Sequence, residues 1–371
     1  MPHPRVASVH VYPVKGCKGI DVQCAYFEGT GLAYDRAWMV VQESNGKFKT
    51  QRQKPRLALV KTSITSDALT QTSKSPPADA FLTLSAPDMD DLQLQIPLGQ
   101  PGELKKVICW EFEGTAFDQG DEAAAWFTKY LKSPHRLVRY AGNVPEGSIP
   151  ADTSRRPTDP KWTTDQEVAF ADGFPALIIS QGLLDELNKR LEKPLPMNRF
   201  RPNFVVTGCR PAEEDEWQQY GIGPGVVVEA VKPCDRCVVT CTDQDTGEVG
   251  KEPLLTLKEF RSSAALSWQL SPSAVFFGWN LVPVVEGLVR VNDEIEVIKR
   301  RETIVAVPSK ADKAKLMTAQ QIPQMQEDNR GGVGAAALQG IAAAVGVASI
   351  LISFMYILMK MMDPQEPLQP T

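Results

Sequence analysis

The chain has 371 residues, of which 43% are hydrophobic and 23% are charged, and its net charge at pH 7 is −5. This length allows two domains with hydrophobic cores, and the negative charge excludes the overall basic field that draws proteins to nucleic acid. No charged and then apolar leader begins the sequence, so we expect no secretory signal. The seven cysteines, an odd number, therefore indicate free thiols in a reducing compartment.

Short β-like runs dominate residues 5–115, where Gly, Pro and Asp separate them. These runs are VASVHVYP, AWMVVQ, LALVKTSI, AFLTLSA and LQLQIPL. The segment GDEAAAWFTKYLKSP predicts a helix, because Trp126, Phe127 and Tyr130 lie on one apolar stripe. Residues 143–168 are polar and rich in proline, which predicts a long surface loop near a domain boundary.

The second half repeats this pattern with buried strands and two helices. Strands are predicted at PALIIS, NFVVTG and GVVVEAV, and a hairpin that turns at Asn292-Asp293 is predicted from GLVRVNDEIEVIK. An amphipathic helix is predicted from SQGLLDELNKRLEKP, whose apolar face extends to Leu191, and another helix is predicted to start at Pro253. Many strands with few helices favour an α+β fold that is mostly β and barrel-like.

The composition changes again towards the C-terminus. Residues 299–330 are charged and polar, which predicts a tether. The run from Gly331 to Met359 holds no charge, and as a helix it would be about 43 Å long, against roughly 30 Å of bilayer hydrocarbon. We therefore expect a C-terminal transmembrane helix at residues 331–360 and a short tail at residues 361–371. Such a tail anchor would leave the folded part in the cytosol; a buried core helix or a flexible Ala/Gly tail is the alternative.

The segment VKPCDRCVVTC contains three cysteines, Cys234, Cys237 and Cys241. A structural zinc site needs four ligands, and the sequence has neither a second C-x-x-C pair nor histidines at knuckle spacing. A thioredoxin-like dithiol needs C-x-x-C at the start of a helix, whereas CVVTC is predicted as strand. Three partly buried thiols in a β-rich core are the simplest interpretation of the spacing alone.

Other polar residues accompany this segment, and each by itself fits a surface cap or an ion pair. Their order in the chain resembles the MOSC family, and within it the mitochondrial amidoxime-reducing components, over residues 5–298. The matching segments are VYPVKGCKG, DRAWMVV, TQRQKPRLALV, NRFRPNFVVTGC, KPCDRCVVTCTDQDTGEVGKEPLLTLKEFR and FFGWN.

The resemblance implies an N-terminal MOSC-type β-barrel domain at residues 1–142 and a MOSC domain at residues 143–298. It also implies Mo-molybdopterin, the molybdenum cofactor, with Cys237 as both metal ligand and catalytic residue. A thiolate is a soft donor that suits this metal, and the pterin supplies further sulfur ligands, so one protein ligand suffices. The implied cofactor-binding residues are Lys15, Gly16, Arg36, Asp172, Arg201, Asn203, Asp235, Arg236 and Asn280.

Two of these positions depart from the family, which carries Ser where this chain has Gly16 and Asp235. An acid two residues from the metal ligand changes the charge near the cofactor and the pKa of a bound water. These departures bear on substrate range and leave the ligand position itself in place.

The activity implied by the resemblance is that of a molybdenum-dependent oxidoreductase acting on N–O bonds, with amidoximes and hydroxylamines as substrates. The sequence has no G-x-G-x-x-G fingerprint and no haem motif, so the electrons must come from a partner. The family's partners are cytochrome b5 and NADH-cytochrome b5 reductase, and a shared membrane raises their effective concentration. The mitochondrial outer membrane is preferred over the endoplasmic reticulum. The alternatives are a non-catalytic carrier of the molybdenum cofactor or of sulfur, and a tail-anchored binding protein with an empty site.

Overall fold

The fold described is that of a computed structural model, which covers residues 3–96, 102–143, 155–268 and 270–302. Strands predominate, and α-helices are limited to three in these ranges, which confirms a mostly β fold with few helices. The helices are α1 (Gly120–Leu131), α2 (Gln181–Asn188) and α3 (Leu254–Phe260). None of the helices in this part of the chain is long and apolar enough to cross a membrane. The predicted transmembrane segment at residues 331–360 lies outside the described residues.

The largest sheet has eight strands in the order β18–β14–β15–β16–β12–β13–β1–β2. All of its pairs are antiparallel except β12 with β13. The strands are β1 (Arg5–Val11), β2 (Ile20–Val22), β12 (Ala176–Ser180), β13 (Phe204–Thr207), β14 (Trp217–Ile222), β15 (Val226–Asp235), β16 (Phe276–Val285) and β18 (Ile295–Arg300).

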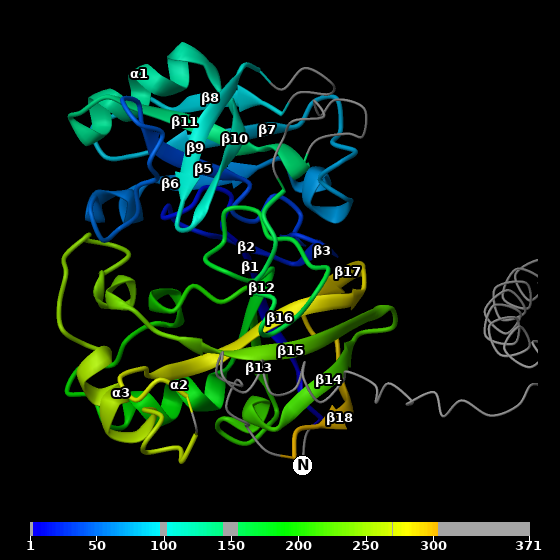
Figure 1. Ribbon diagram of the computed structural model, residues 1–371. Helices are drawn as coiled ribbons and strands as arrows, with labels where there is room; N and C mark the ends of the chain where they lie inside the picture. The colour runs from blue at the N-terminus through cyan, green and yellow to red at the C-terminus, as the bar shows by residue number, and fades with distance from the viewer. Residues whose placement is uncertain (1–2, 97–101, 144–154, 269, 303–371) are drawn as a thin grey trace, which may run out of the picture. The chain divides into compact units, whose positions relative to one another are not determined.

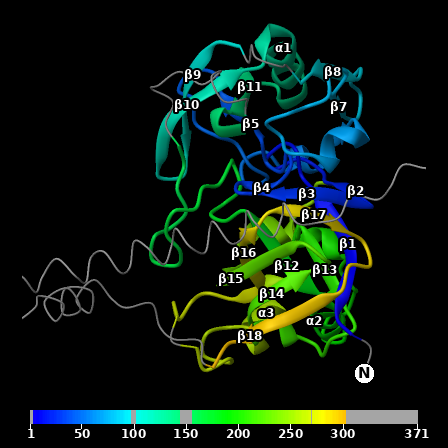
Figure 2. The same ribbon diagram turned by 90° about the vertical axis from the view of Figure 1, so that its right-hand side faces the viewer.

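Three smaller sheets complete the fold, in the orders β5–β11–β10–β9, β17–β3–β4 and β6–β7–β8. In both views, α1 lies near β11 of the four-stranded sheet, and α2 and α3 lie with the eight-stranded sheet (Figures 1 and 2). The strands are β3 (Cys24–Glu28), β4 (Gly31–Leu32), β5 (Trp38–Gln42), β6 (Lys61–Ile64), β7 (Phe81–Ser85), β8 (Leu92–Gln95), β9 (Leu104–Cys109), β10 (Phe112–Asp118), β11 (His135–Tyr140) and β17 (Gly287–Arg290). The 3-10 helices are η1 (Pro55–Leu59), η2 (Ser66–Thr70), η3 (Ala141–Asn143), η4 (Met197–Arg199), η5 (Glu213–Asp215) and η6 (Val238–Cys241).

The two halves of the chain exchange strands. The first strands, β1 and β2, belong to the eight-stranded sheet with strands of the second half, and β17 pairs with β3. One buried cluster accordingly joins Val9 of β1, Trp38 of β5, Phe127 of α1 and Trp279 of β16. This exchange brings residues near position 15 next to residues near positions 172 and 201.

The segment after β15 differs from the prediction. Cys237 to Cys241, predicted as strand, form the N-cap and the turn of η6, where the Thr240 N–H donates to the Cys237 carbonyl at 3.0 Å. Strand β15 ends at Asp235, where its pairing with β16 is already irregular. β-Branched residues favour a strand only when a neighbouring strand is available to pair with them, so propensity alone gave the wrong element.

The predicted hairpin near the end of the domain is also wrong. The chain does reverse at Asn292, which has a φ of 73°. However, β17 on one side of the turn pairs with β3, and β18 on the other side pairs with β14. A turn signal is local and does not determine which strands pair. The predicted apolar face of α2 is shorter than expected, because the helix ends at Asn188 and Leu191 packs against the same cluster from beyond it.

A buried carboxyl group in η5 provides a test of the core. Glu214 is 1% exposed, and its Oε1 accepts from the Ser180 N–H at 2.8 Å, while Oε2 has no hydrogen-bond partner among the described residues. Burial, with a smaller contribution from Asp215, raises the pKa of Glu214 from 4.5 to about 7. The folded state therefore holds a proton that the unfolded chain releases, and the resulting stability is lost as the pH rises from 4.5 through 7.

We expect the Glu214→Gln variant to lose this pH dependence. Relative to the variant, the wild-type free energy of unfolding should fall between pH 4.5 and pH 8 by on the order of 3 kcal/mol. Urea titrations at several pH values measure this difference. The Glu296→Gln variant, which changes an exposed carboxyl group on β18, is the control and should follow the wild type. Parallel curves for wild type and Glu214→Gln would contradict the assignment.

Candidate functional site

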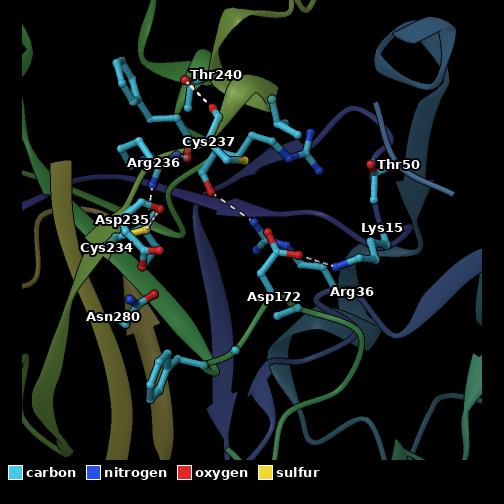
Figure 3. Close-up of a pocket in the computed structure, with 18 of the residues that line it drawn as sticks. Lys15, Arg36, Thr50, Asp172, Cys234, Asp235, Arg236, Cys237, Thr240 and Asn280 are labelled. Atoms are coloured by element: carbon cyan, nitrogen blue, oxygen red, sulfur yellow. Dashed lines mark hydrogen bonds and ion pairs between the residues drawn. The ribbon is translucent and has the colours of Figure 1, made fainter. Parts of the chain in front are cut away.

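A cavity of about 360 Å³ is lined by residues from both halves of the chain. In the view of Figure 3, Lys15 and Thr50 lie on one side, Arg236 and Cys237 lie on the other, and Asp172 lies between them. All ten residues that the sequence singled out line this cavity: Lys15, Gly16, Arg36, Asp172, Arg201, Asn203, Asp235, Arg236, Cys237 and Asn280. They come from segments as far apart as β1 and β16, and the strand exchange brings them together.

Cys237 presents a thiol that no protein group uses. It is partly buried at the start of η6, and its Sγ makes no hydrogen bond to any described residue. Its main chain is held, because the Thr240 N–H and hydroxyl both donate to the Cys237 carbonyl, at 3.0 and 2.9 Å. A fixed backbone with a free sulfur is the arrangement expected of a soft ligand to a metal.

The two neighbouring cysteines have partners. Cys234 Sγ accepts from Arg236 Nη1 at 2.9 Å, and Arg236 Nη2 donates to the Phe200 carbonyl at 2.6 Å. Burial raises the pKa of the Cys234 thiol, although Arg236 opposes this rise. Cys241 is 3% exposed, does not line the cavity, and its Sγ lies 3.4 Å from the Lys251 carbonyl. All seven cysteines lie in the described part of the chain and are free, with no disulfide among them.

Two arginines with left-handed backbone conformations, Arg36 and Arg201, line the cavity. Arg36 has a φ of 48° and Arg201 a φ of 55°, a conformation that is uncommon for residues with a side chain and that gathers at functional sites. Both guanidinium groups lie over the ring of Tyr12, at 4.2 and 4.3 Å. Arg36 Nη1 donates to the buried Asp35 at 2.5 Å and to Asn203 at 3.1 Å. The ion pair with Asp35 leaves Arg36 compensated.

Arg201, in contrast, has no carboxylate partner among the described residues. Its one hydrogen bond from the guanidinium is long, 3.4 Å from Nη1 to Gln244 Oε1. Burial, followed by repulsion from Arg36, lowers the pKa of Arg201 from 12.5 to about 10. Arg201 is partly buried, and a cation that is removed from water without a counter-charge is costly, so this position fits an anionic group of a ligand.

Lys15 and Asp172 form the third charged element of the site. Lys15 is 5% exposed, and its Nζ donates to Asp172 at 2.5 Å and to the Phe170 carbonyl at 2.7 Å. Desolvation by the surrounding cavity wall would by itself raise the pKa of Asp172, but Lys15, together with the Trp110 N–H, outweighs this effect and holds the pKa well below its usual range. The carboxylate, 69% exposed, is therefore ionised.

The loop that carries Asp172 is fixed by a residue that the sequence did not single out. Arg156 is 6% exposed and donates to the carbonyls of Ala169, Ala171 and Asp172, at 2.7, 2.5 and 3.0 Å. A buried guanidinium suits this task because it presents five donors in a rigid plane. Its sequence context, a polar loop, contains no signal of this role.

The remaining predicted residues shape the backbone around the cavity. Gly16 has a φ of 85°, with 3.5 Å from an added Cβ to its nearest neighbour, so a side chain would have space but an unfavourable conformation. Asn203 bridges β12 and β1 by accepting from the Leu177 N–H and donating to the His10 carbonyl. Asp235 pairs with Lys232 at 2.6 Å, and Asn280 donates to the Lys232 carbonyl at 3.2 Å. The Lys232 pair offsets the acid that this chain carries in place of Ser.

Several lining residues were missed in the sequence because nothing local marks them. Thr50, Gln51 and Arg52 lie just before η1, and Trp110 lies at the tip of the β9–β10 hairpin. Gln51 and Gln244, 193 residues apart, donate to each other at 2.9 Å in both directions. The family stretch TQRQKPRLALV contains the first three residues, so it was the one available signal.

The donor set fits an anionic, metal-bearing ligand. The cavity volume lies in the range typical of cofactor sites, roughly 300–1,000 Å³. Cys237, whose thiol has no hydrogen-bond partner among the described residues, offers a soft metal donor, and Arg201, which has no carboxylate partner among them, offers an anion site. Within the described residues, no three His, Cys, Asp or Glu side chains gather as a set of metal ligands. The residues present therefore suit a metal that arrives with most of its own ligands.

Comparison with known families and proteins gives consistent matches. Residues 3–134 match the MOSC N-terminal beta barrel domain, and residues 165–296 match the MOSC domain. Mitochondrial amidoxime reducing component 2 of Bos taurus is 37% identical over 74% of this chain and 77% of its own length. The human protein of the same name is 37% identical over 78% and 82%. Human mitochondrial amidoxime-reducing component 1 is 35% identical over 79% and 82%.

Proposed function

The chain belongs to the MOSC family, among the mitochondrial amidoxime-reducing components, and on this premise we propose that it is a molybdenum-cofactor-dependent oxidoreductase that reduces N-hydroxylated compounds such as amidoximes and hydroxylamines. MOSC domains are associated with binding of the molybdenum cofactor. One observation carries the proposal: Cys237 lines the same cavity as Arg201, which has no carboxylate partner among the described residues. Of Cys234, Cys237 and Cys241, it is the one whose thiol has no hydrogen-bond partner among those residues.

The proposed roles follow from these contacts. Cys237 is the protein ligand to molybdenum, and Arg201 holds the phosphate of the pterin. The polar edge of the pterin is oriented by Arg36, Asn203 and Lys15. The pterin site is lined by Gly16, Asp235, Arg236 and Asn280. When bound, the cofactor supplies the two-electron redox chemistry that removes oxygen from nitrogen. Arg236 donates a hydrogen bond to Cys234 Sγ, so Cys237 is the sulfur that is available to the metal.

Asp172 has a separate proposed role towards the substrate. Because Lys15 keeps its carboxylate ionised, Asp172 accepts hydrogen bonds and does not supply a proton. An amidoxime presents N–H and O–H donors on one side, and a carboxylate is a strong acceptor for both. Arg156 would keep this acceptor in position through its three carbonyl contacts.

Electron supply and location complete the proposal. Cytochrome b5 and its NADH-dependent reductase are the proposed donors. We further propose the domains at residues 1–142 and 143–298, a tether at residues 299–330 and a C-terminal membrane helix at residues 331–360, with the catalytic part in the cytosol. The relatives are named as mitochondrial proteins, which supports the mitochondrial outer membrane. Confinement of donor and acceptor to one membrane would raise the rate of electron transfer.

The tail proposal predicts the behaviour of the protein on fractionation. Full-length protein should stay with membranes during carbonate washing, because an uncharged run from Gly331 to Met359 is long enough to span. A chain truncated after residue 330 should be released and should still reduce substrate with a soluble donor. Release of the full-length protein by carbonate would overturn the anchor and leave the cofactor proposal unaffected.

The activity is tested by metal analysis and by a reduction assay with the same preparation. Purified protein should contain molybdenum and pterin, and it should reduce benzamidoxime when NADH, cytochrome b5 and its reductase are present. A carrier of the cofactor or of sulfur would contain the cofactor without reducing the substrate. A binding protein with an empty site would show neither.

A further inference from the structure

Arg52 stands out among the cations of the cavity because it has no polar partner. It is exposed at the cavity, and its guanidinium makes no hydrogen bond and no ion pair with any described residue. Its one contact of note is with the ring of Trp110, where the guanidinium carbon lies 4.8 Å from the centroid. All five N–H donors of Arg52 are therefore available to a ligand.

The other cations near Arg52 are occupied. Lys15 is paired with Asp172, Arg199 is paired with Asp243 at 2.8 Å, and Lys232 is paired with Asp235. Arg236 has no acid partner among the described residues, but its guanidinium donates to Cys234 Sγ and to the Phe200 carbonyl. Arg201 has no carboxylate partner among the described residues either, but it is partly buried and lies over the ring of Tyr12. Arg52 is thus the exposed cation of the cavity without a partner among the described residues.

The ring of Trp110 positions the guanidinium of Arg52 at the cavity. Trp110 has a φ of 58° at the hairpin tip, packs on Phe48 with ring centroids 4.9 Å apart, and donates from Nε1 to Asp172 at 3.2 Å. A guanidinium that is stacked on a fixed aromatic ring keeps its planar donors free and loses less entropy on binding. The same Asp172 is proposed above to accept from the substrate, so Trp110 couples the two positions.

We propose that Arg52 is a specificity-determining residue that selects N-hydroxylated substrates bearing a carboxylate. This inference rests on the proposed function and adds a substrate class to it. A carboxylate offers two oxygens that match the guanidinium fork, whereas a neutral ring substituent leaves the charge unpaired. Asp172 does not repel such a ligand, because Lys15 already neutralises it. Asp172 would then bind the N–OH group of the substrate, and Arg52 would bind its carboxylate. Trp110 contacts both residues.

The test compares benzamidoxime with 4-carboxybenzamidoxime in the full-length holoprotein. We expect kcat/KM for the carboxylate to exceed that for the neutral compound. Arg52→Gln should lower kcat/KM for the carboxylate about fivefold, as expected for an ion pair at a partly exposed site, and leave the neutral compound unchanged. The preference should shrink at high salt, because exposed charges are screened.

Arg56→Gln is a matched control. Arg56 is also exposed, and its guanidinium stacks on Tyr130 at 4.7 Å, but it does not line the cavity. The Arg56→Gln substitution removes the same charge from the same segment, so kcat/KM should stay unchanged for both substrates. An equal effect of Arg56→Gln, or an equal effect of Arg52→Gln on both substrates, would overturn the proposal. A fall in pterin content in Arg52→Gln would also overturn it, since Arg52 would then hold the cofactor's phosphate.

A binding measurement separates this inference from the activity itself. Saturation-transfer NMR with benzoate and benzamide, a charged and a neutral probe of one shape, needs no turnover. Wild-type protein should bind benzoate more tightly, and Arg52→Gln should lose this preference. If amidoximes are not reduced but the benzoate preference depends on Arg52, the proposed reaction fails and the anion site stands. If amidoximes are reduced and no preference exists, the site fails and the reaction stands.

Discussion

Replacement of Cys237 by alanine is expected to abolish amidoxime reduction and to leave the purified protein without bound molybdenum. Cys237 lines the cavity, and its Sγ makes no hydrogen bond to any described residue, so its loss removes the proposed metal ligand and no hydrogen bond within the described protein. The Cys237 carbonyl is held by Thr240, so the turn should remain. The thermal midpoint should therefore change little, since substitutions away from packed contacts usually stay within about 0.5 kcal/mol.

The two neighbouring cysteines serve as controls for Cys237. Cys241→Ala changes a buried thiol that lies outside the cavity, so molybdenum content and rate should stay near wild type. Cys234→Ala removes the sulfur that accepts from Arg236 and should keep most of the activity. Metal content by mass spectrometry and steady-state rates measure all three. An inactive Cys234 variant beside an active Cys237 variant would reverse the assignment.

Replacement of Arg201 by methionine should lower cofactor retention at least tenfold while leaving the apoprotein folded. Methionine can pack on the Tyr12 ring where the guanidinium lies in the wild type, so the replacement removes the charge and the 3.4 Å hydrogen bond to Gln244. A charge-assisted contact contributes about 1.5–3 kcal/mol, which corresponds to a factor of ten or more in a competitive exchange. Because Arg201 is partly buried and repelled by Arg36 without an acid partner among the described residues, its replacement should also raise the stability of the apoprotein.

Arg199→Gln is the contrasting variant for this prediction. Arg199 also lines the cavity, but its Nη2 donates to Asp243 at 2.8 Å. Its replacement removes the ion pair with Asp243, so we expect lower stability and a smaller effect on the cofactor. Pterin released per protein and the unfolding midpoint of the apoprotein measure both variants. Unchanged pterin content in Arg201→Met would show that Arg201 is a structural residue.

The sequence was most informative where structure depends on neighbours along the chain. Short β-like runs correctly predicted β1 and β7, and a continuous apolar run correctly predicted β12. The α2 helix was correctly predicted from its apolar stripe, and Ser180 caps it by accepting from the Leu183 N–H at 3.2 Å. Periodicity and capping act within a few residues, so a single stretch contains the necessary information. The motif order likewise identified the family, because each motif is short and contiguous.

Strand partners, by contrast, were decided by the tertiary structure. The turn at Asn292 was correctly located, but β17 pairs with β3, far away in the chain (Gly287 with Phe27), and β18 pairs with β14 (Ile295 with Ile222). The segment CVVTC became η6 because β15 ended at Asp235 and left it unpaired. Pairing depends on the packing of whole faces against one another, which no local window reports.

The same division holds for the cavity. The sequence by itself determined the candidate residues: three clustered thiols and a set of basic and polar side chains in a recognisable order. Only the tertiary structure decided which of them are available, because that depends on partners distant in the chain. Lys15 pairs with Asp172, which lies 157 positions away in the chain. Cys234 Sγ accepts a hydrogen bond from Arg236. Neither Arg201 nor Arg52 has a carboxylate partner among the described residues. Charge compensation is a property of spatial neighbours, so the free thiol and the two uncompensated cations became visible only in the folded chain.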